Sequence, residues 1–505
     1  MDAVAIVATF NAPLPATASQ ISALPQAVTW LQVRTDLASD ISVEWLRQYF
    51  TGKLLYSLRS AAAGGKFQGS KAERHRRLIA ACKHYDMVEL ESGLDLDPEL
   101  LQLIPAEKRM ISWYGPAMPA GQLRAIFTNI ALPAHSYCMV TRCNNPMDAL
   151  QPLLLMKELR RGDLTAFGEG PYGLWSRLLS PYLGAPFLFG QLDNQLRSGG
   201  DLGVHQLMSD YGFPTLMPVR QIFGMVGNKI FHSPSPRLHN TSYQALSHPA
   251  LFLPFYVERF QEFWRNIVES AAFSTLGFSL DGFVMVSPHK EAALAMADKC
   301  SPIAKKAGAA NVMVRHKGKW EAHTTDPESI SNIPHGRRLK AAVIGCGGAG
   351  RAVAAALQQT GAQVTLVNRG KERGLYASDL LGLPFTYLSD FGGSGYDVVV
   401  NATPVGKEND DLPFELESLN PNALVVDLAY GTKPTRLVSA VLERGGTAID
   451  GYDVLLTQVR KQFFFLSGRK MPTEIGREVV LDHGAGLWSR DGDSHAEAFH
   501  SLEAS

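Results

Sequence analysis

The sequence predicts an α/β protein with more than one domain, and three observations support this. The chain has 505 residues, which is too long for a single ordinary hydrophobic core. Strand-like apolar runs alternate with amphipathic stretches from residue 1 to about residue 215. Near residue 341, an apolar strand runs into a glycine-rich turn, an alanine-rich helix and a second strand. We therefore expect β–α units in both halves of the chain.

The first half is predicted to form a (β/α)8 barrel, which we place at residues 1–210. Seven strand-like runs occur in order: VAIVAT, VTWLQVR, KLLYSLR, MVELE, RMISWYG, SYCMVTR and APFLFG. Amphipathic stretches such as SKAERHRRLIAACKHY separate several of them. Repeated β–α units over about 200 residues favour an eight-stranded barrel. Residues 208–221 carry prolines and a glycine, which is typical of a linker.

A G-x-G-x-x-G turn follows the apolar strand AAVI and opens a helix. Glycines in this context let backbone N–H groups approach a pyrophosphate at the helix N-terminus, where the helix dipole favours anions. The strand before, the helix after and the second strand, QVTLV, together are typical of a dinucleotide-binding Rossmann unit. The cofactor-binding residues of this turn are predicted to be Gly345, Gly347, Gly348, Ala349 and Gly350.

The end of the second strand indicates which dinucleotide binds. An acidic residue there would hydrogen-bond the ribose 2′-hydroxyl of NAD, but this chain has Asn368 and Arg369, followed by Lys371 and Arg373. A guanidinium group matches a phosphate. We therefore predict NADP as the cofactor, with Asn368, Arg369 and Arg373 among the residues that bind it.

The second half is predicted to comprise four parts. An α/β domain spans 222–330, the Rossmann domain spans 338–450, and C-terminal helices span 451–480. The polar stretch at 481–505 is expected to be a flexible tail.

Composition excludes several classes of protein. Lysine plus arginine (48) equal aspartate plus glutamate (48), so there is no basic excess of the kind that nucleic-acid binding requires. No apolar run approaches the roughly 18 residues of a membrane-spanning helix. The five cysteines form no C-x-x-C pair, which favours free thiols in a reducing cytoplasm. We predict small-molecule ligands, no metal site, and no nucleic-acid or membrane partner; the oligomeric state is left open.

Polar residues cluster in four short segments of the second half. GNKIFHSPSPRLHN carries Ser233 and Ser235, GFVMVSPHKEAALAMAD carries Lys290, GAANVMV carries Asn311, and AHTTD ends on Asp326. These segments, with NATPVG, DLAYGTKPT and GYDVLLTQVRKQF further on, resemble shikimate dehydrogenase over about residues 222–480. The resemblance implies an NADP-dependent reduction of 3-dehydroshikimate to shikimate, on the route to chorismate and the aromatic amino acids.

The resemblance also implies roles for particular residues. Lys290 would supply the proton for the developing alkoxide or stabilise it, and Asp326 would hold the ammonium group. Ser233 and Ser235 would bind the substrate carboxylate. Further substrate residues would be Asn311, Tyr430 and Gln458, and further cofactor residues would be Asn401, Thr403 and Gly451. For Asn401 and Thr403, turn capping remains an alternative.

Three positions depart from the family pattern. Val286 stands where the family has a hydroxyl residue, Thr324 replaces an asparagine, and Val312 replaces a threonine. Each lost donor costs on the order of one or a few kcal/mol. The Lys–Asp pair is kept, so altered substrate preference, for example towards quinate, is favoured over loss of activity.

The first half resembles type I 3-dehydroquinate dehydratase in several segments, including LQVRTDL, DMVELE and YGLWSRLL. That enzyme forms a Schiff base through a strand lysine and uses a histidine as general acid–base. Here we match Met139 to the lysine and Tyr114 to the histidine, and Gln32 stands in place of a glutamate. Methionine cannot form an imine. The matching arginines are kept, and a ligand site through them stays open: Arg34, Arg59 and Arg177.

The leading interpretation is a shikimate dehydrogenase fused to a degenerate dehydroquinase-like barrel. Three alternatives remain: a fully bifunctional enzyme, which Met139 argues against; a quinate or related dehydrogenase; and a nucleotide-sensing regulator without turnover. The intact pair of Lys290 and Asp326 argues against the regulator, because a sensor does not need a positioned proton donor.

Overall fold

The computed structural model describes residues 3–11, 17–38, 41–192, 200–231, 233–331, 333, 338–407, 409–431 and 434–484. The chain divides into two compact units, residues 1–280 and 281–505. The boundary falls within strand β11 (Ser279–Met285).

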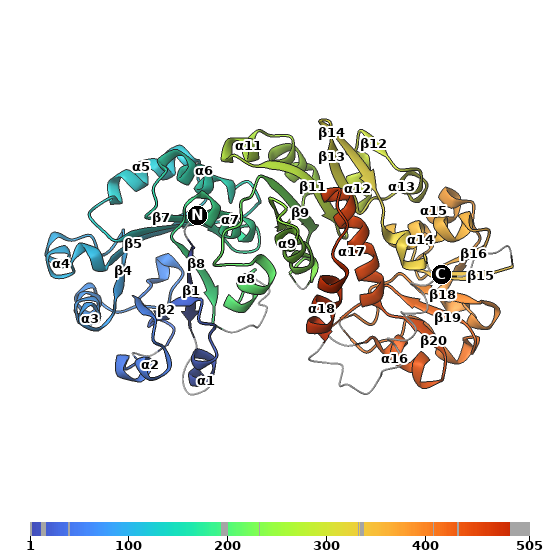
Figure 1. The fold of residues 1–505 in the computed structure, drawn as a ribbon, viewed down its shortest axis with the longest axis horizontal. Coiled ribbons are helices and arrows are strands. Elements are labelled where there is room, and N and C mark those ends of the chain that lie inside the picture. The colour runs from blue at the N-terminus through green and yellow to red at the C-terminus, as the bar shows by residue number, and fades with distance from the viewer. Residues whose placement is uncertain are drawn as a thin grey trace. The chain divides into compact units, whose positions relative to one another are not determined.

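The first unit contains the predicted barrel (Figure 1). Its strands are parallel and hydrogen-bonded in the order β7-β6-β5-β4-β3-β2-β1-β8, which makes a nearly closed barrel. The strands are β1 (Ala5–Phe10), β2 (Val28–Arg34), β3 (Lys53–Ser57), β4 (Met87–Glu91), β5 (Arg109–Pro116), β6 (Ser136–Arg142), β7 (Leu164–Glu169) and β8 (Phe187–Gln191).

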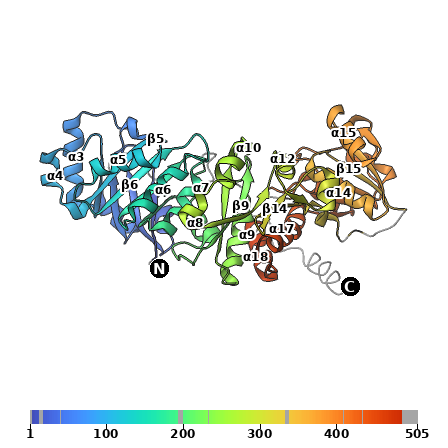
Figure 2. The ribbon, with the colours of Figure 1, turned by 90° about the horizontal axis from the view of Figure 1, so that it is seen from above.

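Barrel helices cover the outside of these strands (Figures 1 and 2). They are α1 (Thr17–Ser22), α2 (Val43–Tyr49), α3 (Lys71–His84), α4 (Pro98–Leu103), α5 (Ala120–Ile130), α6 (Leu150–Leu159), α7 (Leu174–Leu179) and α8 (Val204–Tyr211). One apolar cluster takes side chains from all eight strands and therefore marks the barrel interior: Val7, Trp30, Leu55, Met87, Met110, Cys138, Val140, Phe167, Phe187 and Phe189.

A second layer follows the barrel within the first unit. Its strands β9 (Gln221–Gly227) and β10 (Ala250–Tyr256) pair in parallel. Its helices are α9 (Ser235–Ala245), α10 (Phe260–Phe263) and α11 (Ala272–Leu276). The predicted linker is shorter than expected, because α8 continues to Tyr211 and Phe213 is buried. Apolar side chains in this segment pack into the unit instead of lying in solvent.

The second unit begins with a small mixed sheet in the order β11-β13-β14-β12. Strands β13 (Val312–His316) and β14 (Lys319–His323) form an antiparallel hairpin, while β12 (Lys299–Cys300) pairs with β14 in parallel. Helices α12 (Lys290–Ala295) and α13 (Pro302–Ala307) connect these strands.

The predicted Rossmann unit follows and is confirmed. Six parallel strands run in the order β17-β16-β15-β18-β19-β20, which is the 3-2-1-4-5-6 order of a doubly wound sheet. They are β15 (Lys340–Ile344), β16 (Gln363–Asn368), β17 (Phe385–Tyr387), β18 (Val398–Asn401), β19 (Leu424–Asp427) and β20 (Thr447–Ile449).

Helices bury both faces of this sheet, as its unbroken apolar strands require. Ala341 and Val343 face a core shared with α14 (Gly348–Gln359), α15 (Lys371–Leu381) and α17 (Gly451–Ser467), while Ile344 faces α16 (Arg436–Glu443). Helix α18 (Thr473–Gly484) extends past the expected start of the tail at 481. The rest of the predicted tail, 485–505, lies outside the described residues.

Candidate active site

Lys290 and Asp326 form an ion pair in the second unit. Lys290 opens α12, and Asp326 opens a short 3-10 helix (Asp326–Ile330) that follows β14. The lysine Nζ lies 2.8 Å from Oδ2 and 3.0 Å from Oδ1 of the aspartate. The lysine side chain is 17% exposed and that of the aspartate only 4%. The ammonium group can therefore reach a ligand while the buried carboxylate orients it.

Neighbouring polar residues hold Asp326 in place. Asn311 Nδ2 donates to Oδ1 at 3.1 Å, and Thr324 Oγ1 donates to Oδ2 at 3.3 Å. The backbone N–H of Thr325 donates to Asn311 Oδ1 at 2.8 Å, which fixes the asparagine in turn. Hydrogen bonds to an ionised carboxylate are stronger than neutral ones. Thr324 thus supplies a donor although the asparagine of the family pattern is missing.

Gln462 extends this network and was missed by the sequence reasoning. It is buried on α17, and its Nε2 donates to Thr325 Oγ1 at 3.2 Å. Gln458, the predicted substrate residue, is half-buried on the same helix. Residues four apart share one face of a helix, so the spacing of the two glutamines was a signal that could have identified Gln462.

The glycine-rich turn has the geometry of an anion site. Gly345 adopts φ +101°, in the region that favours glycine. Helix α14 begins at Gly348, and its N-cap residue Gly347 provides no side-chain cap. The N–H groups of the first helical turn have no intrahelical acceptors. A Cβ added at Gly347 would meet no atom within 4 Å, so the approach is open. These features fit a dinucleotide pyrophosphate.

The glycine-rich turn also lies against the ion pair. A Cβ added at Gly348 would come within 3.3 Å of Lys290 Cδ and 2.9 Å of Ala309 Cβ, so this position has room only for glycine. Arg351, on the same helix, is fully buried and donates from NH2 to Glu291 Oε1 at 2.7 Å. The helix that would hold the cofactor is thereby attached to the helix that begins with the lysine.

The basic residues after β16 are placed as a phosphate site requires. Arg369, Lys371 and Arg373 are all exposed, and within the described part of the chain none makes a side-chain hydrogen bond or ion pair. Asn368 has a structural contact, because its Oδ1 accepts a bond of 3.2 Å from the N–H of Cys346 in the glycine-rich turn. The donor set is suited to the 2′-phosphate of NADP.

Asn401 and Thr403 bond within their own turn. Asn401 Nδ2 donates to Asp427 Oδ1 at 2.9 Å, and Thr403 Oγ1 donates to Asn401 Oδ1 at 2.6 Å. The N–H of Val405 then donates to Thr403 Oγ1 at 3.2 Å. This is the turn-capping arrangement of the alternative interpretation, and it stands beside the predicted cofactor role.

Tyr430 and Gly451 lie at neighbouring turns of the second unit. The ring of Tyr430 lies 5.6 Å from that of Tyr452, and Lys407 Nζ lies 4.7 Å from the Tyr430 ring centroid. Gly451 is buried at the start of α17, packed against the backbone of Ala429. Both predicted residues therefore belong to the region where β19 and β20 end.

The serine pair lies in the first unit, where α9 begins. Ser233 Oγ donates to Ser235 Oγ at 3.1 Å, and the N–H of Ser235 donates to Ser233 Oγ at 3.3 Å. Ser235 is buried and Ser233 is half-buried. The two hydroxyls thus converge, as binding of one carboxylate would require.

The barrel interior contains a buried charged cluster. Arg59 Nε lies 3.5 Å from Glu89 Oε1, and the guanidinium lies 4.3 Å from the ring centroid of Tyr114. Tyr114 donates to Glu89 Oε1 at 2.6 Å. Burial raises the pKa of Glu89, but Arg59 and hydrogen-bond donors outweigh it and leave the pKa below its usual value. Burial and Glu89 raise the pKa of Tyr114.

The strand position matched to the lysine must be corrected by one residue. Cys138 belongs to the interior cluster, and successive strand residues point to opposite faces, so Met139 faces outward. Burial, with Glu89 nearby, raises the pKa of Cys138 to about 12. The interior position is thus a protonated thiol. It offers neither an amine nor a thiolate nucleophile.

Ion pairs within the unit neutralise the other two retained arginines. Arg34 forms a bidentate pair with Asp36, with two distances of 2.8 Å. Arg177 NH1 lies 3.1 Å from Asp201 Oδ1 and its guanidinium lies over the ring of Phe167. Both side chains are about 10% exposed.

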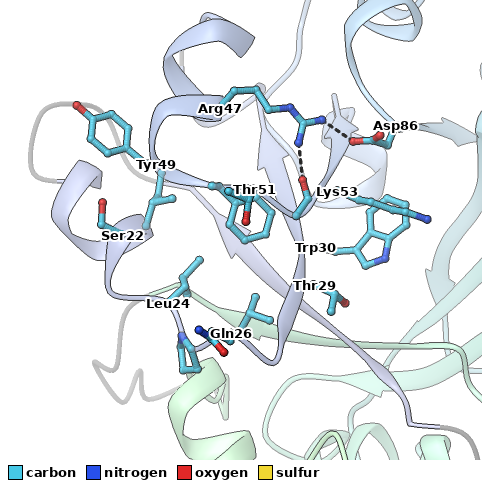
Figure 3. Close-up of a pocket in the computed structure, with 15 residues that line it drawn as sticks. Ser22, Leu24, Gln26, Thr29, Trp30, Arg47, Tyr49, Thr51, Lys53 and Asp86 are labelled. Carbon is cyan, nitrogen blue, oxygen red and sulfur yellow. Dashed lines mark hydrogen bonds and ion pairs between the residues drawn. The ribbon is translucent and has the colours of Figure 1, made fainter.

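A cavity of about 790 Å³ lies at the end of the barrel where the strands begin, between α1, α2 and the first residues of β2 and β3 (Figure 3). There Arg47 reaches Asp86 at 2.7 Å and the carbonyl of Gly52, and Lys53 lies over the ring of Trp30. Active sites of such barrels form at the carboxyl ends of the strands. This cavity is therefore not part of the candidate site.

The described residues contain no group of three or more His, Cys, Asp or Glu side chains arranged to hold a metal ion. They also contain no helix long and apolar enough to span a bilayer.

Comparisons with known proteins agree with both halves of this description. The family model "Type I 3-dehydroquinase" matches residues 15–216, and "Shikimate dehydrogenase substrate binding domain" matches residues 225–313. A shikimate dehydrogenase (NADP(+)) of Natronomonas pharaonis is 32% identical over 267 residues, covering 51% of this chain and 98% of that protein. The chain belongs to the shikimate dehydrogenase family.

The chain is also similar to a protein that combines both activities. The chloroplastic bifunctional 3-dehydroquinate dehydratase/shikimate dehydrogenase of Arabidopsis thaliana is 30% identical over 337 residues. The match covers 62% of this chain and 55% of that protein, so the chain spans little more than half of that relative's length. The crystal structure of Aquifex aeolicus shikimate dehydrogenase is 28% identical, with a TM-score of 0.47, and covers 52% of this chain and 97% of that one.

Proposed function

We propose that this chain is an NADP-dependent shikimate dehydrogenase that interconverts 3-dehydroshikimate and shikimate through Lys290 and Asp326. The observation that carries the proposal is the ion pair itself, with 2.8 Å between Nζ and Oδ2 and a lysine that remains partly exposed. Family membership supports the reaction class, and the exposed basic residues after β16 support NADP over NAD.

The chemistry divides between cofactor and protein. Bound NADPH supplies a hydride to the ring ketone. The carbonyl oxygen gains negative charge as the hydride adds, and Lys290 donates a proton to it to give the alcohol. In the reverse direction the lysine accepts the hydroxyl proton. Asp326, held by Asn311 and Thr324, keeps the ammonium group directed at this oxygen.

Substrate binding needs donors for one carboxylate and several hydroxyls. The converging hydroxyls of Ser233 and Ser235 suit the carboxylate. Gln458 and Tyr430 are proposed for the ring hydroxyls and the carboxylate.

The test is a spectrophotometric assay of NADP+ and NAD+ reduction with shikimate and with quinate. We expect turnover with NADP+ and shikimate. Absence of turnover with either acid would contradict the proposal. Faster turnover with quinate would instead support the quinate dehydrogenase alternative, for which the lost hydroxyl at Val286 is the relevant observation.

The second candidate is a bifunctional enzyme that also dehydrates 3-dehydroquinate. The match of residues 15–216 to type I 3-dehydroquinase favours it. The interior residues Cys138 and Tyr114 argue against it, because Cys138 offers no imine-forming amine and Tyr114 stands at the position of the general acid–base histidine. Borohydride trapping with 3-dehydroquinate, followed by mass spectrometry, decides between them: an adduct on a lysine of residues 1–216 would establish the bifunctional enzyme.

A further inference from the structure

Three barrel helices pack directly against the layer that carries the serine pair, all within the first unit. Helix α7 contacts β10, α8 contacts α9, and α6 contacts α11. Helices α8 and α9 lie side by side in both views (Figures 1 and 2). The outer surface of the barrel is therefore continuous with the layer that contains Ser233 and Ser235.

The α7 contact is an aromatic cluster centred on Trp175. Its ring lies 5.5 Å from that of Phe255 on β10 and 5.4 Å from that of Phe273 on α11. Trp175 and Phe255 are fully buried and Phe273 is 2% exposed. Trp175 is not a member of the interior cluster of the barrel. Large aromatic side chains bury 150–250 Å² each, as a rough guide, so this cluster is a shared core of the two layers.

The α8 contact fixes the orientation of α9. Asn240, on α9, donates from Nδ2 to the carbonyl of Asp210 on α8 at 2.9 Å and to the carbonyl of Phe252 on β10 at 3.0 Å. Its Oδ1 accepts from the N–H of Phe252 at 2.7 Å. Both polar atoms of the amide are thus used, in three hydrogen bonds. One side chain fastens α9 to a barrel helix on one side and to the sheet on the other.

We propose that the barrel is the scaffold of the substrate layer, with Trp175 and Asn240 as positioning residues for the serine pair. Helix α9 begins at Ser235, so its placement sets where the two hydroxyls converge. The barrel thereby has a structural role. Its retained arginines are already paired with carboxylates, and a cysteine stands at the position of the imine-forming lysine. The part of the inference that concerns substrate rests on the proposed function.

The test compares two tryptophans in the full chain. Trp175→Phe alters the shared core, whereas Trp30→Phe makes the same change inside the barrel, where Trp30 is 6% exposed. Misplacing binding groups weakens substrate use, so Trp175→Phe should raise KM for shikimate by about three- to tenfold. Turnover and KM for NADP+ should stay within about twofold. Trp30→Phe should leave all three constants unchanged.

Hydrogen exchange provides a readout that does not need activity. In Trp175→Phe, the amides of 235–245 should exchange at least tenfold faster, and in Trp30→Phe they should not. Unchanged exchange at 235–245 in Trp175→Phe would overturn the scaffold role. Faster exchange in a protein that never turns over shikimate would leave the scaffold role standing and reject the proposed function.

Wild-type protein gives the same test if Trp175→Phe does not fold. Under increasing denaturant, the amides of α9 should open together with those of β10 and α7 as one unit. Opening of α9 at a lower denaturant concentration than α7 would overturn the proposal.

Discussion

The barrel interior and the Lys290–Asp326 site both bury charged side chains, but they differ in what those charges can do. In the barrel, Arg59 is 16% exposed and is matched by Glu89 at 2%. Burial lowers the pKa of Arg59, but Glu89 outweighs this and leaves it raised. In the second unit, Lys290 is 17% exposed and Asp326 is 4% exposed, so the two pairs are buried to the same extent. They differ in the cation, because an ammonium group can release and regain a proton whereas a guanidinium group stays protonated.

The difference shows that buried charge alone does not make an active site. A catalytic group must exchange a proton with a ligand, so it needs a partner that orients it and an open side. The barrel cluster has the partners without a nucleophile, because its interior cysteine stays protonated. On the proposed function, the chemistry belongs to the second unit, and the paired charges of the barrel contribute to its stability.

Removing the proton donor should have the largest effect. Lys290→Ala is expected to lower turnover by about 10²–10⁴-fold, the usual contribution of a general acid–base group, while the fold and NADPH binding persist. Lys299→Ala is the matched control, because Lys299 is exposed and pairs only loosely with Glu321 at 3.9 Å. Near-wild-type turnover in purified Lys290→Ala would remove the basis of the comparison.

Breaking the barrel pair should affect stability instead of activity. Glu89→Ala leaves the Arg59 guanidinium buried and unpaired, which costs about 3–5 kcal/mol. Denaturant midpoints would show the loss, while KM and turnover of the folded enzyme stay the same. The double change Arg59→Met with Glu89→Leu is the control, since replacing both partners by apolar residues is often neutral. An equally small loss of stability in the single and double variants would contradict the stabilising role of the Arg59–Glu89 pair.

A pH dependence should also arise from the first unit. His239 is fully buried against Phe252, and burial lowers its pKa from 6.5 to about 3. Below about pH 6.5 the unfolded chain binds a proton at this histidine that the folded chain does not bind. The contribution of His239 to the free energy of unfolding is therefore fully present above about pH 6.5 and is lost as the pH falls towards 3. The slope is about 1.4 kcal/mol per pH unit. In urea titrations, the difference in free energy of unfolding between wild type and His239→Gln should therefore change between about pH 6 and pH 4. A difference that stays constant over this range would refute the prediction.

The smallest expected effect concerns cofactor choice. Arg369→Ala should weaken NADP+ binding by roughly 10- to 150-fold, since hydrogen bonds to charged groups contribute roughly 1.5–3 kcal/mol, and should hardly change NAD+ binding. Lys305→Ala, which removes a basic residue from α13, serves as the control. Fluorescence titration with both cofactors measures the ratio. Equal losses for the two would show that Arg369 does not read the 2′-phosphate.

The fold was predictable because its signals are local and repeated. The barrel was predicted from apolar strands that alternate with amphipathic stretches. The Rossmann unit was predicted from the glycine spacing after an apolar strand. The residue pair Lys290 and Asp326 was also found, through motifs that fix backbone positions. What the sequence could not give were contacts between distant elements, such as Gln462 with Thr325 and Trp175 with Phe255.

The error at Met139 has a separate physical cause. A strand alternates its faces at every residue, so a shift of one in an alignment exchanges an interior position for an exterior one. Only the packing of Cys138 with side chains from the other strands reveals which face is inside. The conclusion about the missing amine survives, because neither residue provides one.

The most direct measurement follows NADPH absorbance in one sample during two additions. 3-Dehydroquinate is added first, and 3-dehydroshikimate second. If the chemistry belongs to the second unit alone, the absorbance stays constant after the first addition and falls after the second. A fall after the first addition with shikimate as the product would show that the barrel dehydrates 3-dehydroquinate, whereas a fall with quinate as the product would show that the second unit reduces 3-dehydroquinate itself. A constant signal after both additions would show that Lys290 and Asp326 do not perform the reduction.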